Sequence, residues 1–462
     1  MHGPASLLLQ FFPPYLGPSY LLALIPPMME TIGMAFGAMF IALALSLPLA
    51  VAAAMRLPGA ALLLNGLTAF RAIPELTLAI LCVILFGIGP GAGLIALALY
   101  YAAAMAKMFV DILGTAPRGP LEALRATGAS PLKVALFGLL PLKRGDLLTY
   151  GAYEFESALR ASIVVGAVGG GGIGSELVGS LAAFDFPRVT TQILVLVAVI
   201  AAFDAAAVHV RRHPHWLLAL LPVGLLAVVV DGPRLLALNH AIDVFGQMLP
   251  PTITSTDLAR LPQRLIETVW MAAAGTGGAV AAALVFGPAA ARNLAPGWLA
   301  FPVRRLMELL RTVPEVVWGL VLITLVGVGP AAGAWALGVH SAGSLGRLFA
   351  DSLENAPQRP QTAIRQTGAS PLQVFAWATT PLALGPLAAH SLFRLEWNLR
   401  MATVLGLIGA GGIGQALYEA QQLMFYRQML TYILITAVLI WSLDHFSRSF
   451  RMKHGLLQAT PI

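Results

Sequence analysis

Two glutamate–arginine pairs lie within apolar stretches of the sequence, and they are the side chains best placed to do chemistry. Glu156 and Arg160 are four residues apart, as are Glu396 and Arg400, so each pair shares one face of a helix. At membrane depth an ionisable side chain costs roughly 2.5–3.5 kcal/mol on insertion scales, so it must face a partner or water. Either each pair neutralises itself and holds helices together, or the arginines flank a polar path with Asn398. A guanidinium fork donates to two oxygens of an oxyanion at once, which suits the second role.

Glycine-rich runs follow both pairs, at 169–174 and 409–414. A P-loop that cradles phosphate needs a lysine directly after a glycine, and no lysine in this chain follows one. We therefore predict that these glycines end a span, let backbones pack closely and form an outer gate. If ATP drives this protein, the ATPase must be another chain. The predicted gate residues are Gly171, Gly172, Gly174, Gly411, Gly412 and Gly414.

The composition indicates that these residues lie in a membrane. Of 462 residues, 58% are hydrophobic and 11% are charged, and the mean hydropathy is +0.81. Soluble domains carry about 25% charged residues, so a cytosolic enzyme is excluded, as are a disordered chain and a collagen. The single cysteine, Cys82, excludes an intrachain disulfide. The net charge of +7 fits basic cytoplasmic loops better than nucleic-acid binding.

The chain is a tandem repeat, because several motifs recur at a nearly constant offset. A Glu-Thr dipeptide at 30 recurs 237 residues later, and from residue 71 onward the offset stays at 240. Two copies of one module have been fused. The clearest repeated motifs are Arg-x-x-Pro-Glu at 71–75 and 311–315, Gly-x-Gly-Pro at 87–90 and 327–330, and Gly-Gly-Ile-Gly at 171–174 and 411–414.

Each copy contains five apolar segments long enough to be predicted as spans. An odd number would invert the second copy, so we assign an extra crossing to the apolar run 216–230 in the linker, which makes about eleven in total. The other predicted spans are 31–54, 73–88, 91–113, 147–168 and 192–210, then 268–290, 313–328, 331–349, 387–407 and 429–441.

The predicted fold is therefore an all-α polytopic membrane protein with three parts. Residues 1–212 form the first module with an external N-terminal segment, 213–262 form the linker with its one crossing, and 263–462 form the second module. No lysine or arginine precedes Arg56, so we expect no cleaved signal peptide, an external N-terminus and a cytoplasmic C-terminus.

The inner loop after the third span has the same form in both copies. It reads Leu-Glu-Ala-Leu-Arg-Ala-Thr-Gly-Ala-Ser-Pro-Leu at 121–132 and Gln-Thr-Ala-Ile-Arg-Gln-Thr-Gly-Ala-Ser-Pro-Leu at 361–372. The glycine predicts the end of a short helix, and Ser-Pro predicts the N-cap and first turn of a second one. A rigid helix–turn–helix of this kind is a structure that a mechanical partner could grip.

This loop resembles the coupling loop of type I ABC-transporter permeases, which carries a Glu-Ala-Ala…Gly motif and docks into a groove of the ATP-hydrolysing subunit. The second copy has Thr362 where the motif has its acid, so the resemblance implies weaker or asymmetric docking there. The residues that the resemblance assigns to ATPase coupling are Glu122, Ala123, Arg125, Gly128, Ala363, Arg365 and Gly368.

The segments 153–174 and 393–414, which overlap the fourth spans, narrow the resemblance to the phosphonate ABC-transporter permease family. The second copy is the closer match, since the first has Ser157 and Ala158 in place of Trp397 and Asn398. The resemblance implies two ATP-binding subunits on the cytoplasmic face, which would hold the ATP and magnesium, and a periplasmic or lipid-anchored substrate-binding protein. It also implies a prokaryotic inner membrane, a phosphorus oxyanion as substrate, and no cofactor, metal or catalytic residue in this chain.

Two alternatives stay open at this point. The methionine-type importers share a similar Gly-Ala-Gly-Gly-Ile-Gly ending, so the solute could be another small molecule. An ATP-independent secondary transporter can also contain parallel repeats. The paired coupling loops argue against a secondary transporter, because such a carrier has no ATPase subunit to bind them.

Overall fold

The computed structural model describes residues 10–55, 57–60, 62–64, 66, 73–212, 216–231 and 238–453, and every regular element among them is a helix. The chain divides into two compact units, Leu8–Leu249 and Pro250–Ile462, which we call the N-terminal and C-terminal units. Arg56 and Arg71 lie outside the described residues. The predicted all-α class is confirmed.

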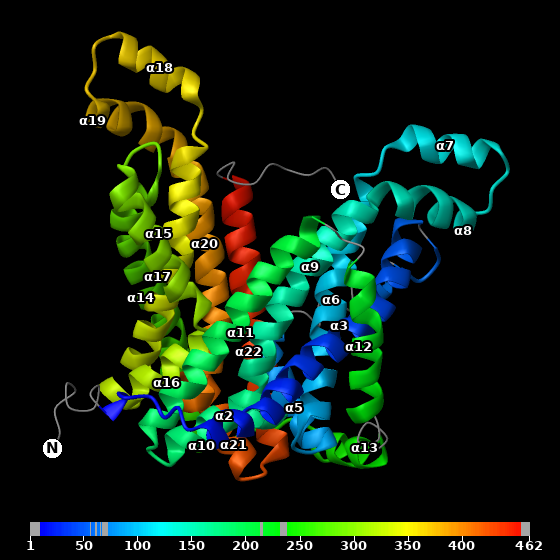
Figure 1. Cartoon of the computed structure of the whole chain (residues 1–462). Coiled ribbons are helices and arrows are strands. Elements are labelled where there is room, and N and C mark those ends of the chain that lie inside the picture. The colour runs from blue at the N-terminus through cyan, green and yellow to red at the C-terminus, as the bar shows by residue number, and fades with distance from the viewer. Residues whose placement is uncertain are drawn as a thin grey trace. The chain divides into compact units, whose positions relative to one another are not determined.

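The N-terminal unit is centred on three long helices, α3, α6 and α9, which pack against one another. The linker helix α12 packs on α3, and α11 packs on α9 and α10 (Figure 1). The helices are α2 (Pro18–Ala23), α3 (Ile25–Ala54), α5 (Glu75–Phe86), α6 (Pro90–Gly114), α7 (Arg118–Ala126), α8 (Pro131–Val134), α9 (Leu140–Val165), α10 (Gly172–Ala182), α11 (Phe186–Arg212), α12 (Trp216–Asp231) and α13 (Leu238–Gln247), with π-helical turns at Ala135–Leu139 and Gly166–Gly170.

The C-terminal unit has the same plan, with α14, α17 and α20 at its centre and α22 packed on α20 and α21. Its helices are α14 (Ser255–Ala290), α15 (Gly297–Thr312), α16 (Glu315–Val326), α17 (Pro330–Glu354), α18 (Gln358–Gln366), α19 (Pro371–Val374), α20 (Thr380–Leu405), α21 (Gly412–Gln422) and α22 (Tyr426–Lys453), with π-helical turns at Phe375–Thr379 and Gly406–Ala410.

The tandem repeat extends to the ends of the helices. Each helix from α5 to α10 begins and ends 240 residues before its counterpart among α16 to α21. The reason is local: the residues that start and stop these helices, such as Pro90 and Pro330 at N1, recur at the same offset. The two units are therefore copies of one backbone design.

All eleven predicted segments are helical, but they are not equally long. Within the described residues, six helices are long and apolar enough to cross a bilayer, or eight if two bent pairs each count as one span. One bent pair is α15 and α16, which meet at 88°. The 12 residues of α16 extend only about 18 Å, so this helix crosses the hydrocarbon only together with its neighbour. Helix α15 was not predicted.

Small residues let the central helices approach closely. An added Cβ at Gly93 of α6 would lie 2.7 Å from Met34 Sδ of α3, and one at Gly333 of α17 would lie 2.6 Å from Met271 Sδ of α14. The same glycine–methionine contact therefore joins the same two helices in both units. Such small-residue contacts are how helices pack in lipid, where apolar burial alone gives little attraction.

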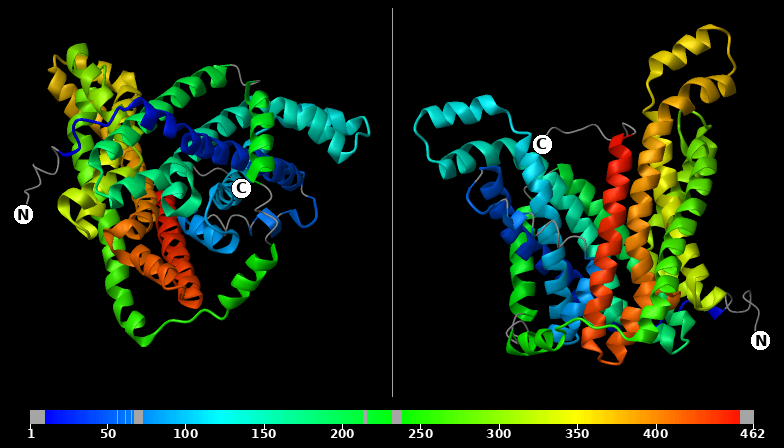
Figure 2. Two further views of the ribbon diagram at one scale, coloured as in Figure 1. Left: turned by 60° about the horizontal axis from the view of Figure 1, so that its bottom comes forward. Right: turned by 180° about the vertical axis from the view of Figure 1, so that it is seen from behind.

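Each unit carries its helical hairpin at one end and its glycine break at the other. Helix α9 follows α7 and α8 directly and leads to the glycines, and α20 does the same after α18 and α19. Both are 26 residues long, about 39 Å at 1.5 Å per residue. The right-hand view of Figure 2 shows, within each unit, the hairpin at one end and the helix that follows the glycine break at the other.

Candidate functional site

The predicted helix–turn–helix is present in both units. Gly128 ends the first helix at φ +76° and Gly368 does so at φ +84°, a left-handed conformation that favours glycine. The second helix begins at a serine cap in both units: Ser130 Oγ accepts from Lys133 N at 3.5 Å, and Ser370 Oγ accepts from Gln373 N at 3.4 Å. The local sequence thus fixes the hairpin, as predicted.

The residues assigned to coupling lie on the exposed side of these hairpins. All seven of them are exposed: Glu122, Ala123, Arg125, Gly128, Ala363, Arg365 and Gly368.

Large apolar side chains lie beside the residues that the resemblance assigns to coupling. Leu132 is 64% and Phe137 73% exposed, and Leu372 and Trp377 are each 75% exposed. In the C-terminal unit Trp377 and Gly368 line a cavity of about 460 Å³. Exposed apolar groups rimmed by polar ones are typical of a protein–protein interface.

The glycine runs separate α9 from α10 in the N-terminal unit and α20 from α21 in the C-terminal unit. After α9 the backbone turns at Gly169, Gly171 and Gly172, all with positive φ, before α10 begins. The same three positions, 409, 411 and 412, turn the chain before α21. The prediction that these glycines end the span is confirmed, whereas their role as a gate stays a prediction.

The Glu-Thr dipeptides cap the helix that starts after this break. Glu30 Oε2 accepts from Gly172 N and Thr31 Oγ1 accepts from Ile173 N, each at 2.9 Å. These first amides of α10 have no partner within their own helix, so side chains from α3 supply one.

The C-terminal unit repeats the cap at the same distances. Glu267 Oε2 accepts from Gly412 N, and Thr268 Oγ1 accepts from Ile413 N, each at 2.9 Å. The Gly-x-Gly-Pro motif joins the same place, because Gly89 N donates to Gly169 O at 2.9 Å and its counterpart Gly329 donates to Gly409 O at 3.1 Å. Three motifs that are far apart in the sequence thus meet in each unit.

The Glu–Arg pairs are bonded differently in the two units. In the N-terminal unit Arg160 forms an ion pair with Glu156, four residues earlier. In the C-terminal unit α20 is tied to α22: Arg400 pairs with Asp444 at 2.6 Å, and Glu396 pairs with Arg451 at 2.7 Å. The two pairs of the C-terminal unit hold α20 to α22, whereas the pair of the N-terminal unit lies within α9. Contact with a substrate stays a prediction.

A buried polar network that the sequence did not reveal lies in the C-terminal unit. Glu315 Oε1 is 3.2 Å from Arg394 Nη2, 3.1 Å from His340 Nε2 and 2.9 Å from Trp397 Nε1, which donates to it. The side chains of Glu315 and Arg394 are only 11% and 12% exposed. The signal available in the sequence was Arg394 within an apolar run, two residues before Glu396.

Asn398 belongs to this network. Its Nδ2 donates to Thr276 Oγ1 at 2.9 Å, and its Oδ1 accepts from Ser341 Oγ at 2.9 Å, while Ser341 Oγ in turn accepts from Arg394 Nε at 2.7 Å. Asn398 is fully buried. In this conformation it bridges α14, α17 and α20; its predicted place beside the transport path remains untested.

The N-terminal unit has different residues at the corresponding positions. Glu75 matches Glu315, but the positions of Arg394 and His340 are taken by Glu154 and Tyr100. Glu75 and Glu154 are both buried, and the Tyr150 hydroxyl donates to Glu154. One backbone design therefore encloses a mixed-charge network in one unit and two acids with tyrosines in the other.

Two segments of the chain match one protein family. The family model described as "Binding-protein-dependent transport system inner membrane component" matches residues 46–214 and 279–451. The chain belongs to this family. It is therefore a multi-pass permease of the inner membrane, built from two family modules, in a transport system that depends on a binding protein.

Curated relatives of this permease are also transport subunits. The phosphate-import permease protein PhnE of Mycolicibacterium smegmatis is 29% identical over 413 residues, covering 84% of this chain and 76% of that protein. The phosphite transport system permease protein PtxC of Stutzerimonas stutzeri is 38% identical over 240 residues, covering 52% of this chain and 85% of PtxC. PtxC thus matches about half of this permease. The resemblance to phosphonate permeases drawn from the coupling loops and fourth spans is confirmed.

A solved structure also aligns with one half of the permease. The MetNI methionine ABC transporter in an inward-facing conformation is 20% identical, with a TM-score of 0.40, and the alignment covers 45% of this chain and 100% of that one.

The helix cap predicts a stability effect. Replacing Thr268 by Val keeps the shape but removes the oxygen that accepts from Ile413 N, and a buried donor left without a partner costs about 1–3 kcal/mol. We expect a lower melting temperature for purified T268V and a near wild-type value for T268S. Thr324→Val is the control, since that hydroxyl only donates to Leu320 O within its own helix. Equal melting temperatures for T268V and T324V would contradict the role of the cap.

The buried ion pair predicts a second effect. Arg394→Met leaves the Glu315 carboxylate buried without its guanidinium partner, a loss of roughly 3–5 kcal/mol. The double variant E315Q/R394M should melt higher than R394M, because the stranded charge is gone. Arg305→Met is the matched control, because that side chain is 62% exposed in its pair with Glu308 and such pairs contribute at most about 1 kcal/mol. A double variant no more stable than R394M would refute this account.

Proposed function

We propose that this permease forms the complete membrane pathway of an ATP-driven importer for phosphonate or a related phosphorus oxyanion. The observation that carries the proposal is the double family match, since each matched half contains its own exposed hairpin. The relatives named for phosphate and phosphite transport support the substrate class. The chain itself would make and break no bonds.

The partners follow from the same features. Two hairpins offer two sites for ATP-binding subunits, which would hold ATP and magnesium on their own chains. A periplasmic or lipid-anchored binding protein would deliver the oxyanion to the opposite end of the permease. The hairpin end would then be cytoplasmic, with the N-terminus outside, and the functional parts would be 1–212, 213–262 and 263–462. The Glu–Arg pairs at 156–160 and 396–400, with Asn398, are our candidates for the translocation path, and the glycine breaks are candidates for its gate.

Co-purification tests the assembly. The full chain, expressed at native level and extracted in a gentle detergent, should bring along an ATPase subunit at two copies per chain, measured by mass spectrometry. The binding protein found with it should then bind phosphonate, phosphite or phosphate in a titration. A clean chain without an ATPase would reject the proposal and favour an ATP-independent carrier, and a binding protein that ignores all three anions would reject the substrate class.

The two hairpins should contribute unequally to coupling. Glu122 is an exposed acid, whereas Thr362 at the same place donates its hydroxyl back to Gln358 O at 3.0 Å. We expect Gly128→Arg to reduce transport and ATPase stimulation more than Gly368→Arg. Both glycines have positive φ, and an added Cβ meets no atom within 4 Å at either site, so backbone strain is matched between the variants. Equal losses in the two variants would remove the asymmetry.

A further inference from the structure

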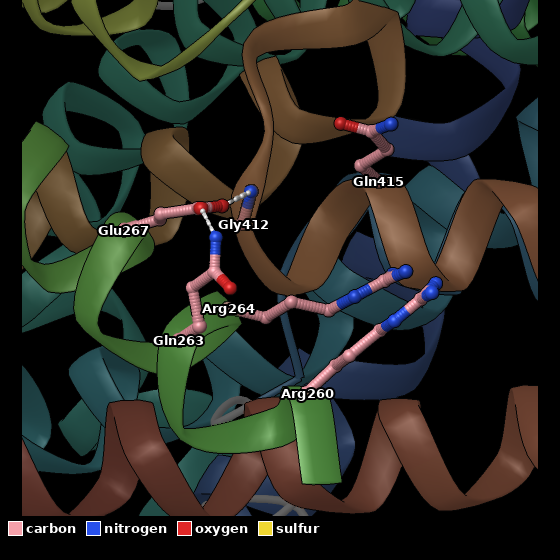
Figure 3. Close-up of a pocket in the computed structure, with 6 residues that line it drawn as sticks. All are labelled: Arg260, Gln263, Arg264, Glu267, Gly412 and Gln415. Atoms are coloured by element: carbon pink, nitrogen blue, oxygen red, sulfur yellow. Dashed lines mark hydrogen bonds between the residues drawn. The ribbon is translucent and has the colours of Figure 1, made fainter. Parts of the chain in front are cut away.

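A charged cavity lies at the glycine end of the C-terminal unit. It occupies about 270 Å³ and is lined by Arg260, Gln263, Arg264, Glu267, Gly412 and Gln415. Four of these residues are on the first turns of α14 and two are at the start of α21 (Figure 3). The hairpin of the same unit is at the far end of α20.

The acidic groups at the cavity already have partners for both of their oxygens. Glu267 Oε1 accepts from Gln263 Nε2 at 2.8 Å, and its Oε2 is the cap of Gly412. The neighbouring Glu419 accepts from Gln415 Nε2 at 2.9 Å on Oε1 and from Arg264 Nη2 at 2.7 Å on Oε2. Glu419 therefore balances the charge of Arg264, whereas both oxygens of Glu267 accept from neutral donors within the unit.

The arginines, in contrast, have donors to spare. Arg264 is 14% exposed, and its Nη1 is buried with no hydrogen-bond partner in the described part of the chain. Arg260 is exposed, and no carboxylate of a described residue lies within 4 Å of its guanidinium. Figure 3 shows both side chains extending in the same direction, and as residues four apart on α14 they share one face of that helix and line the same cavity. The guanidinium of Arg260 can therefore attract an anion, and the buried donor of Arg264 calls for an acceptor.

The corresponding place in the N-terminal unit keeps the cap and lacks the cations. At the 237 offset Ala23 replaces Arg260 and Pro27 replaces Arg264, while Glu30 still caps Gly172. The arginines are therefore not required by the backbone design. Arg264 also ties α14 to α21 through Glu419, whereas Arg260 makes no such contact within the described residues.

We propose that this cavity binds a tetrahedral phosphorus oxyanion between Arg260 and Arg264. A guanidinium fork donates to two such oxygens at once, and the surplus donors of both arginines match the acceptor oxygens of the anion. The choice of phosphorus rests on the proposed function, in which this end of the permease faces the incoming substrate. A phospholipid phosphate offers the same oxygens, so the source of the anion is either the free substrate or a headgroup.

Binding to the purified full chain tests the site. The probe is methylphosphonate, followed by ³¹P NMR line broadening in a detergent that contains no phosphorus. Arg260→Gln should weaken binding about tenfold or more, since a hydrogen bond to a charged group is worth about 1.5–3 kcal/mol. Arg264→Lys keeps the charge that pairs with Glu419 but loses the fork, so it should weaken binding as well. Arg427→Gln is the control, an exposed arginine of the same unit outside the cavity, and should bind as wild type.

A second arm identifies the source of the oxyanion. The chain is extracted from phospholipid bilayers and measured by native mass spectrometry. If a headgroup is the ligand, R260Q should lose the bound phospholipid and R427Q should keep it. Methylphosphonate should then fail to displace the phospholipid. Methylphosphonate binding that survives delipidation identifies the free anion instead.

Three results would overturn the site. The first is that the wild-type chain binds no phosphorus oxyanion in either arm, and the second is that R260Q and R427Q lose oxyanion binding equally. The third is that R260Q binds the oxyanion as wild type but no longer associates with the binding protein, which would assign the arginines to protein docking. If the assembled transporter imports phosphonate while the chain shows any of these results, the proposed function stands and only this site fails. If the transporter carries another solute while R260Q, unlike R427Q, loses methylphosphonate binding, the site stands and the proposed substrate class fails.

Discussion

The structure depends on how each unit satisfies the backbone groups that are freed where its fourth helix breaks. Within a bilayer, an amide without a partner costs several kcal/mol, so a helix can be interrupted only where the protein itself supplies acceptors. Glu30 and Thr31 supply them in one unit, and Glu267 and Thr268 in the other. Each cap fixes α3 or α14 against the glycine turn of its unit. In the N-terminal unit the Gly89–Gly169 hydrogen bond also fixes the turn before α6 to the same place. The break is therefore a junction of three segments.

Around this shared backbone, the buried charges differ between the units. Helix ends are set by local groups such as prolines, glycines and caps, and these recur at the 240 offset. The identity of the buried polar side chains is constrained less strictly by the backbone, because different sets can satisfy one another's hydrogen bonds within the unit. The C-terminal unit thus contains Glu315 with Arg394 and His340, whereas the N-terminal unit has Glu154 where Arg394 would be. Duplication preserved the design of the backbone and let the two interiors diverge.

The two ends of each unit suit different partners. At the hairpin end, exposed apolar side chains such as Trp377 lie beside the residues predicted to couple to an ATPase, and they favour contact with a protein surface. At the glycine end of the C-terminal unit, Arg260 and Arg264 favour an anion. Since α9 and α20 each connect one end to the other within a single element, a shift at a hairpin can be transmitted along a stiff helix to the break. This is the mechanical basis on which an ATP-driven cycle would act.

The sequence by itself determined the membrane class, the duplication, the helical segments, the hairpins and the family, because composition, periodicity and caps act over short stretches of chain. Only the tertiary structure decided which residues pair. Helix spacing placed Glu396 and Arg400 on one face, yet Arg400 pairs with Asp444 of α22 and Glu396 with Arg451. The Glu-Thr dipeptide was visible as a repeat, but its role as a cap depends on a glycine turn some 140 residues away. Partners so far apart are chosen by the packing of helices, which no local pattern records.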